Sequence, residues 1–258
     1  CLKGRSLLSL DFRLLSKHCS NGEKMISIVI PAFNEENRIG PTLEGIASFL
    51  KQTKRDFEII VVFDGNDATP RVVKEFARKN SLERKARVLE FKKRLGKGGA
   101  VMKGFEEAKG EIVFLSDADR SVPPREMGKL LNALENSDIA IGSRYLKSSK
   151  ARIPFERYFF AFVFHLVVGL FFGLPFKDTQ CGFKAFRKNA VKKLLPLVKT
   201  KGFAWDVDVL VQSRKLSLIV KEIPIEWRLE KGGTITFKNG LQTALRMFVT
   251  LLKLRFSR

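Results

Sequence analysis

Short apolar runs alternate with helical patterns along the chain, and this alternation limits the folds that the sequence can adopt. The runs Ile26–Ile30 and Glu58–Phe63 are compact and rich in branched residues, as buried parallel strands are. Between them, apolar residues recur at helical spacing from Ile39 to Leu50, and Pro41 suits the first turn of a helix. Repeated strand–helix units with short loops predict an α/β fold with a mostly parallel sheet flanked by helices.

The same alternation continues as far as Tyr145. In a parallel sheet of this kind, ligands bind beyond the carboxyl ends of the strands, so polar motifs that directly follow a strand are candidates for a functional site. The remaining predicted elements are helices over Pro70–Lys79, Lys97–Ala108 and Pro124–Leu134 and strands over Arg87–Phe91, Ile112–Leu115 and Ile139–Ile141.

The motif Ser116-Asp117-Ala118-Asp119 follows the apolar strand predicted over Ile112–Leu115. Two carboxylates one residue apart at a strand end can meet a hard divalent cation with one or both side chains. Mg²⁺ or Mn²⁺ usually binds through one or two carboxylates and substrate phosphates. We therefore expect Asp117 and Asp119 to hold such a metal. A lone Asp-x-Asp would equally suit a turn with two solvated acids, so the neighbouring motifs matter.

Three further motifs lie at the same predicted edge of the sheet. Pro31–Glu36 and Phe63–Thr69 each follow a strand, and polar groups at two adjacent strand ends make a shelf for a base and a ribose. Asp64 could accept a hydrogen bond from a ring N–H on that shelf. Arg94–Ala100 opens a helix, where glycines permit close backbone approach, and Lys97 with the helix N-terminus favours phosphate.

In this order and spacing the motifs resemble glycosyltransferase family 2, whose fold is the GT-A fold. The closer resemblance is to its branch of dolichyl-phosphate glucosyltransferases and dolichyl-phosphate mannose synthases. It rests also on Gly142–Tyr145 and on Asp178–Lys184, and it covers roughly the chain from Ile26 to Glu230. The resemblance implies a transferase that moves a hexose from a nucleotide-sugar to a polyprenyl or dolichyl phosphate.

The resemblance also implies roles for single residues. The nucleotide would be bound by Pro31, Ala32, Phe33, Glu35, Asp64, Lys97 and Asp117. The metal and the diphosphate would be held by Asp117 and Asp119, which would act in catalysis together with Arg144.

The lipid phosphate would be bound by Arg144, Arg157 and Arg228. Asp178 and Gln180 would position the sugar or the loop that carries them, although Asp178 would equally suit a structural role as a helix cap. Mannose synthases often carry Gln two residues after the second Asp, where this chain has Ser121. The donor therefore stays open between UDP-glucose and GDP-mannose.

The expected chemistry needs no strong protein base. A phosphate monoester has a second pKa near 6 and is largely ionised at neutral pH, unlike a sugar hydroxyl. In-line attack would invert an α-linked donor into a β-linked lipid-phosphate sugar. The arginines would offset the repulsion between two anionic substrates, because a guanidinium binds phosphate through a fork of donors.

The net charge of +21 and the pI near 10.1 are unusual for an enzyme with a neutral substrate. Such an excess predicts an anionic partner: nucleic acid, an acidic membrane surface or a phosphorylated substrate. Residues 144–193 contain eleven Lys or Arg against two acids, and residues 214–258 contain ten against three. The basic excess therefore lies mainly in the C-terminal half.

Two segments of that half suit the surface of an anionic membrane. The Phe-rich run Phe159–Phe176 reaches the lower length limit of about 17–25 residues for a membrane span. A single span would place the next motifs on the opposite side, so we expect the segment 155–176 to be interfacial or re-entrant. Leu241–Phe256 reads as a basic amphipathic helix that lies on a bilayer or packs on the domain, with its apolar face formed by Leu241, Leu245, Phe248 and Leu252.

These segments define the expected organisation. Residues 1–24 would be an N-terminal arm or an overlong start, residues 25–230 the catalytic domain and residues 231–258 the C-terminal helix. The three cysteines lack the spacing of a metal knuckle or a disulfide framework, which favours a reducing compartment. We therefore expect the enzyme at the cytoplasmic face of a membrane.

Two other functions were weighed against this one. A soluble family 2 transferase would act on a sugar or protein acceptor instead of a lipid. A nucleic-acid-binding protein would explain the pI, but its basic residues should form a groove with aromatic stacking platforms, and acids at the strand ends would repel phosphate. We therefore expect no nucleic-acid partner. The second Asp-x-Asp, in Trp205–Asp208, follows a loop and suits either a contributor to the site or an acid pair at a helix start.

Overall fold

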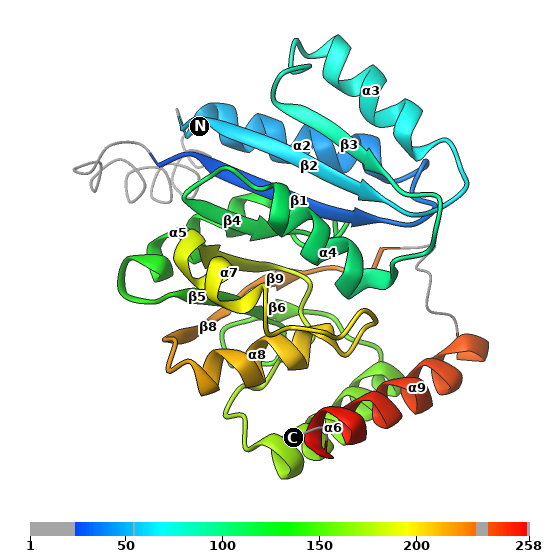
Figure 1. The fold of residues 1–258 in the computed structure, drawn as a ribbon, viewed down its shortest axis with the longest axis vertical. Helices are drawn as coiled ribbons and strands as arrows, with labels where there is room; N and C mark the ends of the chain where they lie inside the picture. The colour runs from blue at the N-terminus through cyan, green and yellow to red at the C-terminus, as the bar shows by residue number, and fades with distance from the viewer. Residues whose placement is uncertain (1–23, 54, 231–236, 257–258) are drawn as a thin grey trace, which may run out of the picture.

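The structure, a computed structural model, describes residues 24–53, 55–230 and 237–256 (Figure 1). Nearly all of the expected N-terminal arm lies outside the described residues, as do residues 231–236 of the expected C-terminal segment. The side chains at 155–157, 159–160 and 237–245 also lie outside them.

A mixed sheet of seven strands forms the centre of the molecule, in the order β3-β2-β1-β4-β7-β5-β8. All neighbouring pairs are parallel except the two that involve β7, which runs antiparallel to both β4 and β5. The strands are β1 (Ile26–Ala32), β2 (Phe57–Phe63), β3 (Ala86–Glu90), β4 (Ile112–Leu115), β5 (Ile139–Ser143), β7 (Lys184–Arg187) and β8 (Val220–Pro224). A separate small sheet pairs β6 (Lys150–Ala151) with β9 (Glu226–Trp227).

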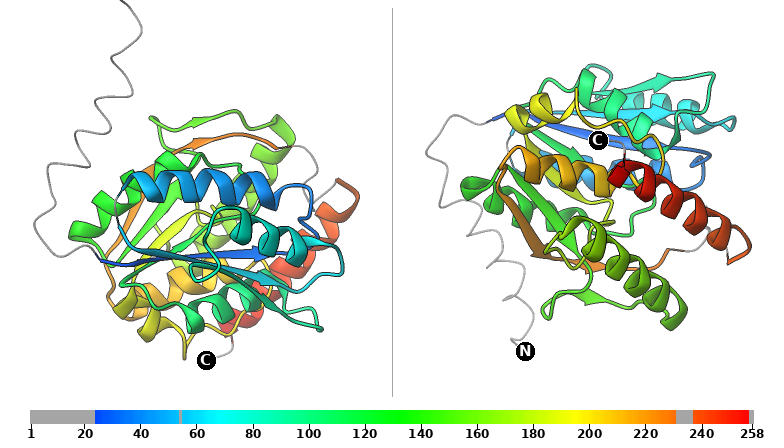
Figure 2. Two further views of the ribbon diagram at one scale, coloured as in Figure 1. Left: turned by 90° about the horizontal axis from the view of Figure 1, so that it is seen from above. Right: turned by 60° about the horizontal axis from the view of Figure 1, so that its bottom comes forward.

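Helices cover both faces of the sheet, because β1, β2 and β4 are apolar on both sides. One face packs against α2 (Ile39–Gln52), α3 (Thr69–Lys79) and α5 (Met127–Ala133). The other packs against α4 (Gly96–Glu107), α7 (Lys188–Leu194) and α8 (Trp205–Lys215). The left view of Figure 2 shows α2 and α4 on opposite sides of the strands.

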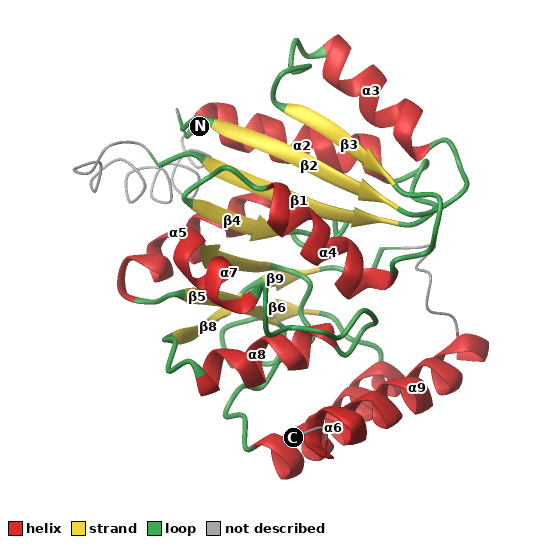
Figure 3. Cartoon of the chain, viewed as in Figure 1, coloured by secondary structure: helices red, strands yellow, loops and turns green. Residues whose placement is uncertain are grey.

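The two remaining long helices, α6 (Phe155–Phe172) and α9 (Phe237–Phe256), lie side by side beyond α8 (Figures 1 and 3). The rings of Phe171 and Phe248 are 6.2 Å apart across this pair. Met247 and Leu251 of α9 are buried, whereas Phe248, which belongs to the predicted apolar face, is exposed. Among the described side chains, the buried face of α9 is therefore displaced from the predicted one. None of the described helices combines the length and the apolar character that crossing a membrane requires.

The predicted fold class is confirmed, and the nine strands and helices predicted before Tyr145 are all present. The antiparallel strand β7 was not predicted. Lys184, its first residue, pairs with Leu115, the last residue of β4, so β7 begins at the edge where the parallel strands end. The segment 178–183 that precedes β7 is therefore carried to that same edge.

The fold predicts where a methyl group is tolerated in a helix. A Cβ at Gly104 in α4 would overlap the Val29 side chain of β1, whereas a Cβ at Gly169 in α6 would meet no atom within 4 Å. Gly104→Ala should lower the free energy of unfolding by about 1–3 kcal/mol through overpacking. Gly169→Ala should raise it by up to about 1 kcal/mol, because alanine favours a helix interior. Urea unfolding measures both, and equal values for the two variants would contradict the packing described.

Candidate active site

The site lies at the edge of the sheet where the parallel strands end, on the right in Figure 1. The loops after β1, β2, β4 and β5 all reach this edge, and the segment before β7 joins them. The first two loops are cross-linked: the backbone N–H of Asn66 donates to Asn34 Oδ1 at 2.9 Å, and that of Glu35 donates to Thr69 Oγ1 at 2.9 Å. Asn34 adopts a positive φ of 57°, a conformation that asparagine tolerates better than most residues.

Asp64 and Phe33, both predicted to bind the nucleotide, lie together through Arg94. The buried Asp64 carboxylate accepts hydrogen bonds from the backbone N–H groups of Leu95 and Gly96, at 2.8 and 3.0 Å, and from the Arg94 guanidinium. The Arg94 Cζ lies 3.5 Å from the centre of the Phe33 ring, which makes a cation–π contact. Arg94 begins the glycine-rich motif but was not predicted to be a site residue.

Asp117 forms an ion pair with Lys97, whose Nζ lies 3.1 Å from Asp117 Oδ1. Burial would raise the pKa of Asp117, but Lys97 holds it below its usual range. Burial would lower the pKa of Lys97, but Asp117 and Asp206 raise it above its usual range. Both groups therefore stay charged near neutral pH. The Asp117 carboxylate lies against Gly182, where a Cβ would overlap it.

The second acid of the motif is held by its own turn, because Asp119 Oδ1 accepts from the backbone N–H of Ser121 at 2.9 Å. Thr42 fixes the same loop from α2, with its hydroxyl donating to the Ala118 carbonyl at 2.7 Å. Arg120, between these points, has a positive φ of 59°. The loop that carries the two aspartates is thus fixed at both ends.

Glu35, after β1, lies near enough to Asp119 and Asp117 to feel their charges. One carboxylate oxygen of Glu35 accepts from Arg38 at 2.7 Å, whereas the other is buried and meets no hydrogen-bond partner among the described residues. Burial raises the pKa of Glu35, and the nearby charges of Asp119 and Asp117 raise it further. A buried acceptor without a donor beside two acids suits a cation or a donor group of a ligand.

These residues fit a divalent metal that takes part of its ligands from a substrate. Within the described ranges, no group of three or more His, Cys, Asp or Glu side chains is arranged to hold a metal ion alone. Mg²⁺ and Mn²⁺ sites built on one or two carboxylates and phosphate oxygens need no larger cluster. Asp117 and Asp119 could supply these carboxylates, and the place of Lys97 shows that a cation is favoured beside Asp117.

The glycine-rich motif packs against a distant part of the chain. Gly96 has a φ of 75°, and a Cβ there would lie 2.6 Å from the Lys201 carbonyl oxygen. A Cβ at Gly98 would lie 2.5 Å from the Thr200 carbonyl oxygen and 2.5 Å from Trp205 Cβ. These glycines are therefore required by contact with the segment before α8, in addition to any approach of a phosphate.

Arg144 and Asp178, which the sequence placed in separate roles, form one unit. Arg144 Nε and Nη2 donate to the two oxygens of Asp178 at 2.7 and 2.8 Å, and the Arg144 backbone N–H adds a bond of 3.0 Å. Burial opposes both charges, yet each holds the other ionised: the pKa of Asp178 is lowered and that of Arg144 is raised. Glu222 of β8 accepts from the Asp178 backbone N–H at 2.7 Å and was missed by the sequence analysis.

The other predicted site residues are less closely joined. Arg228 is exposed and pairs with Glu226, but its backbone N–H donates to the Ser121 carbonyl at 2.8 Å, beside the aspartate loop. The Gln180 amide lies 3.9 Å from the sulfur of Met247 in α9. Arg157 belongs to α6, and its side chain lies outside the described residues.

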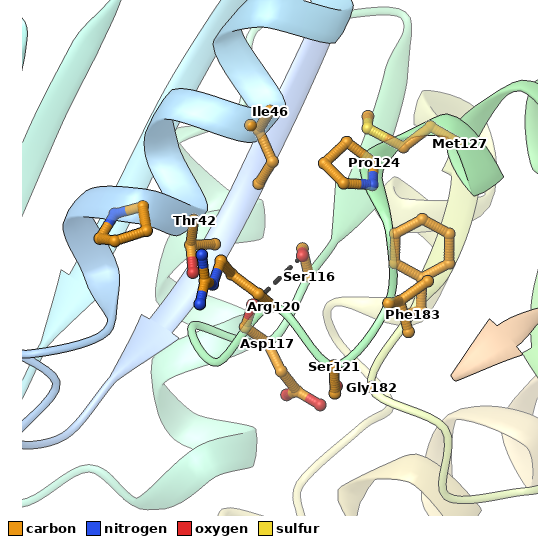
Figure 4. A pocket seen from close by; sticks show the side chains of 13 residues that line it. Thr42, Ile46, Ser116, Asp117, Arg120, Ser121, Pro124, Met127, Gly182 and Phe183 are labelled. Carbon is orange, nitrogen blue, oxygen red and sulfur yellow. Dashed lines mark hydrogen bonds between the residues drawn. The ribbon is translucent and has the colours of Figure 1, made fainter. Parts of the chain in front are cut away.

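A small cavity of about 60 Å³ lies behind the aspartate loop, between α2 and α5 (Figure 4). Thr42, Ile46, Met127 and Phe183 contribute to its wall. Ligand pockets typically occupy roughly 300–1,000 Å³, so this cavity is too small for a nucleotide-sugar. A donor would instead lie over the open edge of the sheet, where the charged groups converge.

Comparison with known proteins gives one family and one fold. Residues 27–195 match the model of glycosyl transferase family 2. A dolichyl-phosphate beta-glucosyltransferase of Drosophila melanogaster is 35% identical over 240 residues, covering 87% of this chain and 73% of the fly protein. The Saccharomyces cerevisiae protein of the same name is 33% identical over 240 residues, covering 85% and 71%.

Among solved structures, glucosyl-3-phosphoglycerate synthase from Mycobacterium tuberculosis, in complex with Mn²⁺, UDP-glucose and phosphoglyceric acid, superposes with a TM-score of 0.68. The match covers 89% of this chain and 79% of that one at 20% identity. At this identity the likeness concerns the fold alone.

The Arg144–Asp178 unit predicts a large effect on stability. Asp178→Asn leaves a largely buried guanidinium (21% exposed) without its counter-ion and should cost about 3 kcal/mol of unfolding free energy at neutral pH. The pKa of Asp178 is lowered in the folded protein, so its contribution is present above about pH 4 and is lost as the pH falls further. Arg228→Gln, at an exposed ion pair, should cost at most about 1 kcal/mol. Urea unfolding tests both, and similar losses would contradict the prediction.

Proposed function

The chain belongs to glycosyl transferase family 2, and we propose that it transfers glucose from UDP-glucose to dolichyl or another polyprenyl phosphate at the cytoplasmic face of a membrane. The observation that carries this proposal is that one short segment contacts both Asp117, on the proposed donor side, and Arg144, on the proposed acceptor side. Within the segment 178–183, Asp178 binds Arg144 and Gly182 lies against Asp117. The names of the fly and yeast relatives support glucose and dolichyl phosphate as the groups transferred and accepted.

The donor side would bind the nucleotide over β1 and β2. Arg94 stacks on one face of the Phe33 ring, and the base would use the other face. The half-exposed guanidinium of Arg94, held by the buried Asp64, would offer donors to the nucleotide. Asp117 and Asp119 would hold a divalent metal, which supplies charge to stabilise the departing nucleoside diphosphate. Lys97 stays cationic there and would offset the same developing charge from the other side. The Mn²⁺ and UDP-glucose bound by the mycobacterial enzyme are consistent with this division.

The acceptor side would bind the lipid phosphate at Arg144. The guanidinium uses Nε and Nη2 on Asp178, which fixes its plane and leaves its remaining donors for a phosphate oxygen. The centres of the Tyr145 and Trp227 rings lie 5.5 and 5.7 Å from Arg144 Cζ, so two aromatic side chains flank the guanidinium. A phosphate monoester is already ionised at neutral pH, so the attacking oxygen needs no protein base.

The membrane would be met by α6 and α9. Exposed apolar side chains recur at four-residue spacing along α6, at Tyr158, Phe162, Leu166 and Leu170. A hollow of about 440 Å³ between α6, α8 and α9 combines apolar side chains with cations, and its lining includes Phe171, Phe172, Arg214, Lys215 and Arg255. Apolar side chains flanked by cations suit an anionic bilayer surface.

The donor and the acceptor are tested in one transfer assay. UDP-glucose with a polyprenyl phosphate in detergent should give a lipid-linked glucose, whereas GDP-mannose should give at least about tenfold less product, since the fly and yeast relatives are named beta-glucosyltransferases. If phosphoglyceric acid is glucosylated but the lipid phosphate is not, the proposed acceptor is wrong. If the protein prefers GDP-mannose to UDP-glucose, the proposed donor is wrong.

The metal site predicts the effect of one carboxylate. Asp119→Ala should reduce transfer by at least about 100-fold while the protein stays folded, because a strand-end carboxylate contributes little to the core. Asp56→Ala, at the opposite end of β2, is the matched control and should leave transfer unchanged. EDTA should abolish the activity of the parent protein, and Mn²⁺ or Mg²⁺ should restore it. Full activity in the presence of EDTA would refute the proposed requirement for a metal.

The membrane surface predicts a change in liposome binding. Leu170 and Phe256 are 81% and 77% exposed, and replacing both with Glu should weaken flotation with anionic liposomes at least about tenfold. Ile219→Glu is the control, because Ile219 is also exposed (57%) but lies at the start of β8, away from the site edge. Unchanged flotation of the double variant, at both low and high salt, would exclude this surface.

A further inference from the structure

A pair of opposite charges is buried behind the donor side of the site. The Lys184 ammonium of β7 contacts the Asp206 carboxylate of α8, and their side chains are 0% and 2% exposed. Removing two charges from water costs more than their attraction usually returns, so apolar residues would often serve a core better. Such a pair suggests a task beyond stability.

The pair continues outward to the site. Asp206 also lies 3.8 Å from the Lys97 ammonium, which in turn lies 3.1 Å from Asp117. The side chains form a row of alternating charge, and their exposure falls from Asp117 (35%) through Lys97 (15%) to Asp206 and Lys184. Two carboxylates and two ammonium groups balance each other in this row. Only its outer end can meet a ligand.

The geometry also fixes the distance between Lys97 and Asp206. Gly96 and Gly98, on either side of Lys97, lie against the backbone of 200–201 and against Trp205. The backbone N–H of Gly99 donates to the Lys201 carbonyl at 3.1 Å. The start of α4 and the start of α8 are therefore held together, and a shift of the Lys97 backbone away from Asp206 would break these contacts.

We propose that Asp206 is a positioning residue that retains Lys97 at the donor site while Lys97 exchanges its contact with Asp117 for the diphosphate of the donor. Lys97 has two carboxylate partners, and it loses Asp117 when that side chain turns to the bound donor. Asp206 then remains as its anchor, and Lys184 balances the charge of that anchor. The inference rests on the proposed function, since it requires a nucleoside diphosphate at Asp117.

The test compares two buried acids, one beside Lys97 and one at the opposite end of β2 from the site. Asp206→Asn keeps the shape and removes the charge that faces Lys97. Glu58→Gln is the matched control, because Glu58 is also buried and also paired with a cation, Arg87 at 2.7 Å, but lies at the start of β2. Calorimetry should show about tenfold weaker UDP binding for Asp206→Asn, in line with the loss of a charged contact, with uridine binding unchanged. Glu58→Gln should bind both ligands as the parent protein does.

A double-mutant cycle separates positioning from a general loss of structure. Lys97→Met should weaken UDP binding by a similar factor, and adding Asp206→Asn to it should cause no further loss. Additive losses, or equal weakening of uridine, would overturn the proposal. If Asp206→Asn does not fold, Lys184→Met with Asp206→Asn removes both buried charges and should show the same selective loss. A parent protein that binds neither UDP nor GDP would refute the proposed function instead.

Discussion

Buried carboxylates at the active edge of the sheet must each be paired, and the shape of the site follows from how that is done. Asp64 is held by Arg94 and two backbone N–H groups, and Asp178 by Arg144. An unpaired charge in such a position would be costly, so each pair fixes the loop that supplies its partner. Loops far apart in the sequence are thereby joined into one surface.

The same requirement explains how a chain with a net charge of +21 builds an acidic site. Lys97 and Lys184, two cations in the interior of this edge, pair with Asp117 and Asp206. The exposed cations, among them Lys215 and Arg255, are free to act on the surroundings of the molecule. A strongly basic protein can thus carry acids at one edge of its sheet, because burial separates the two populations of charge.

Much of the fold could be predicted because its signals are local. An apolar run followed directly by a polar motif marks a strand end, and the positions of Asp117, Asp119, Asp64 and Arg144 after their strands were predicted in this way. Asp206 could not be assigned, because its partners Lys184 and Lys97 lie 22 and 109 residues away in the sequence. Glu222 could not be assigned either, because Asp178 lies 44 residues away. β7 was missed because four residues beginning with a buried lysine give no strand pattern. For the side chains of 237–245, and for Arg157, the predictions stay predictions.

The reversal of β7 has a consequence for how this protein can diversify. Because this strand runs against its neighbours, one short segment, 178–183, forms the common wall between the acidic cluster and Arg144. A residue inserted into that segment would shift Gly182 relative to Asp117 and Asp178 relative to Arg144 at once. Under the proposed function, such a change would disturb donor and acceptor together, whereas changes in the exposed residues of α6 and α9 would leave both contacts in place. The fold thereby separates the proposed reaction centre from a surface that can vary independently of it.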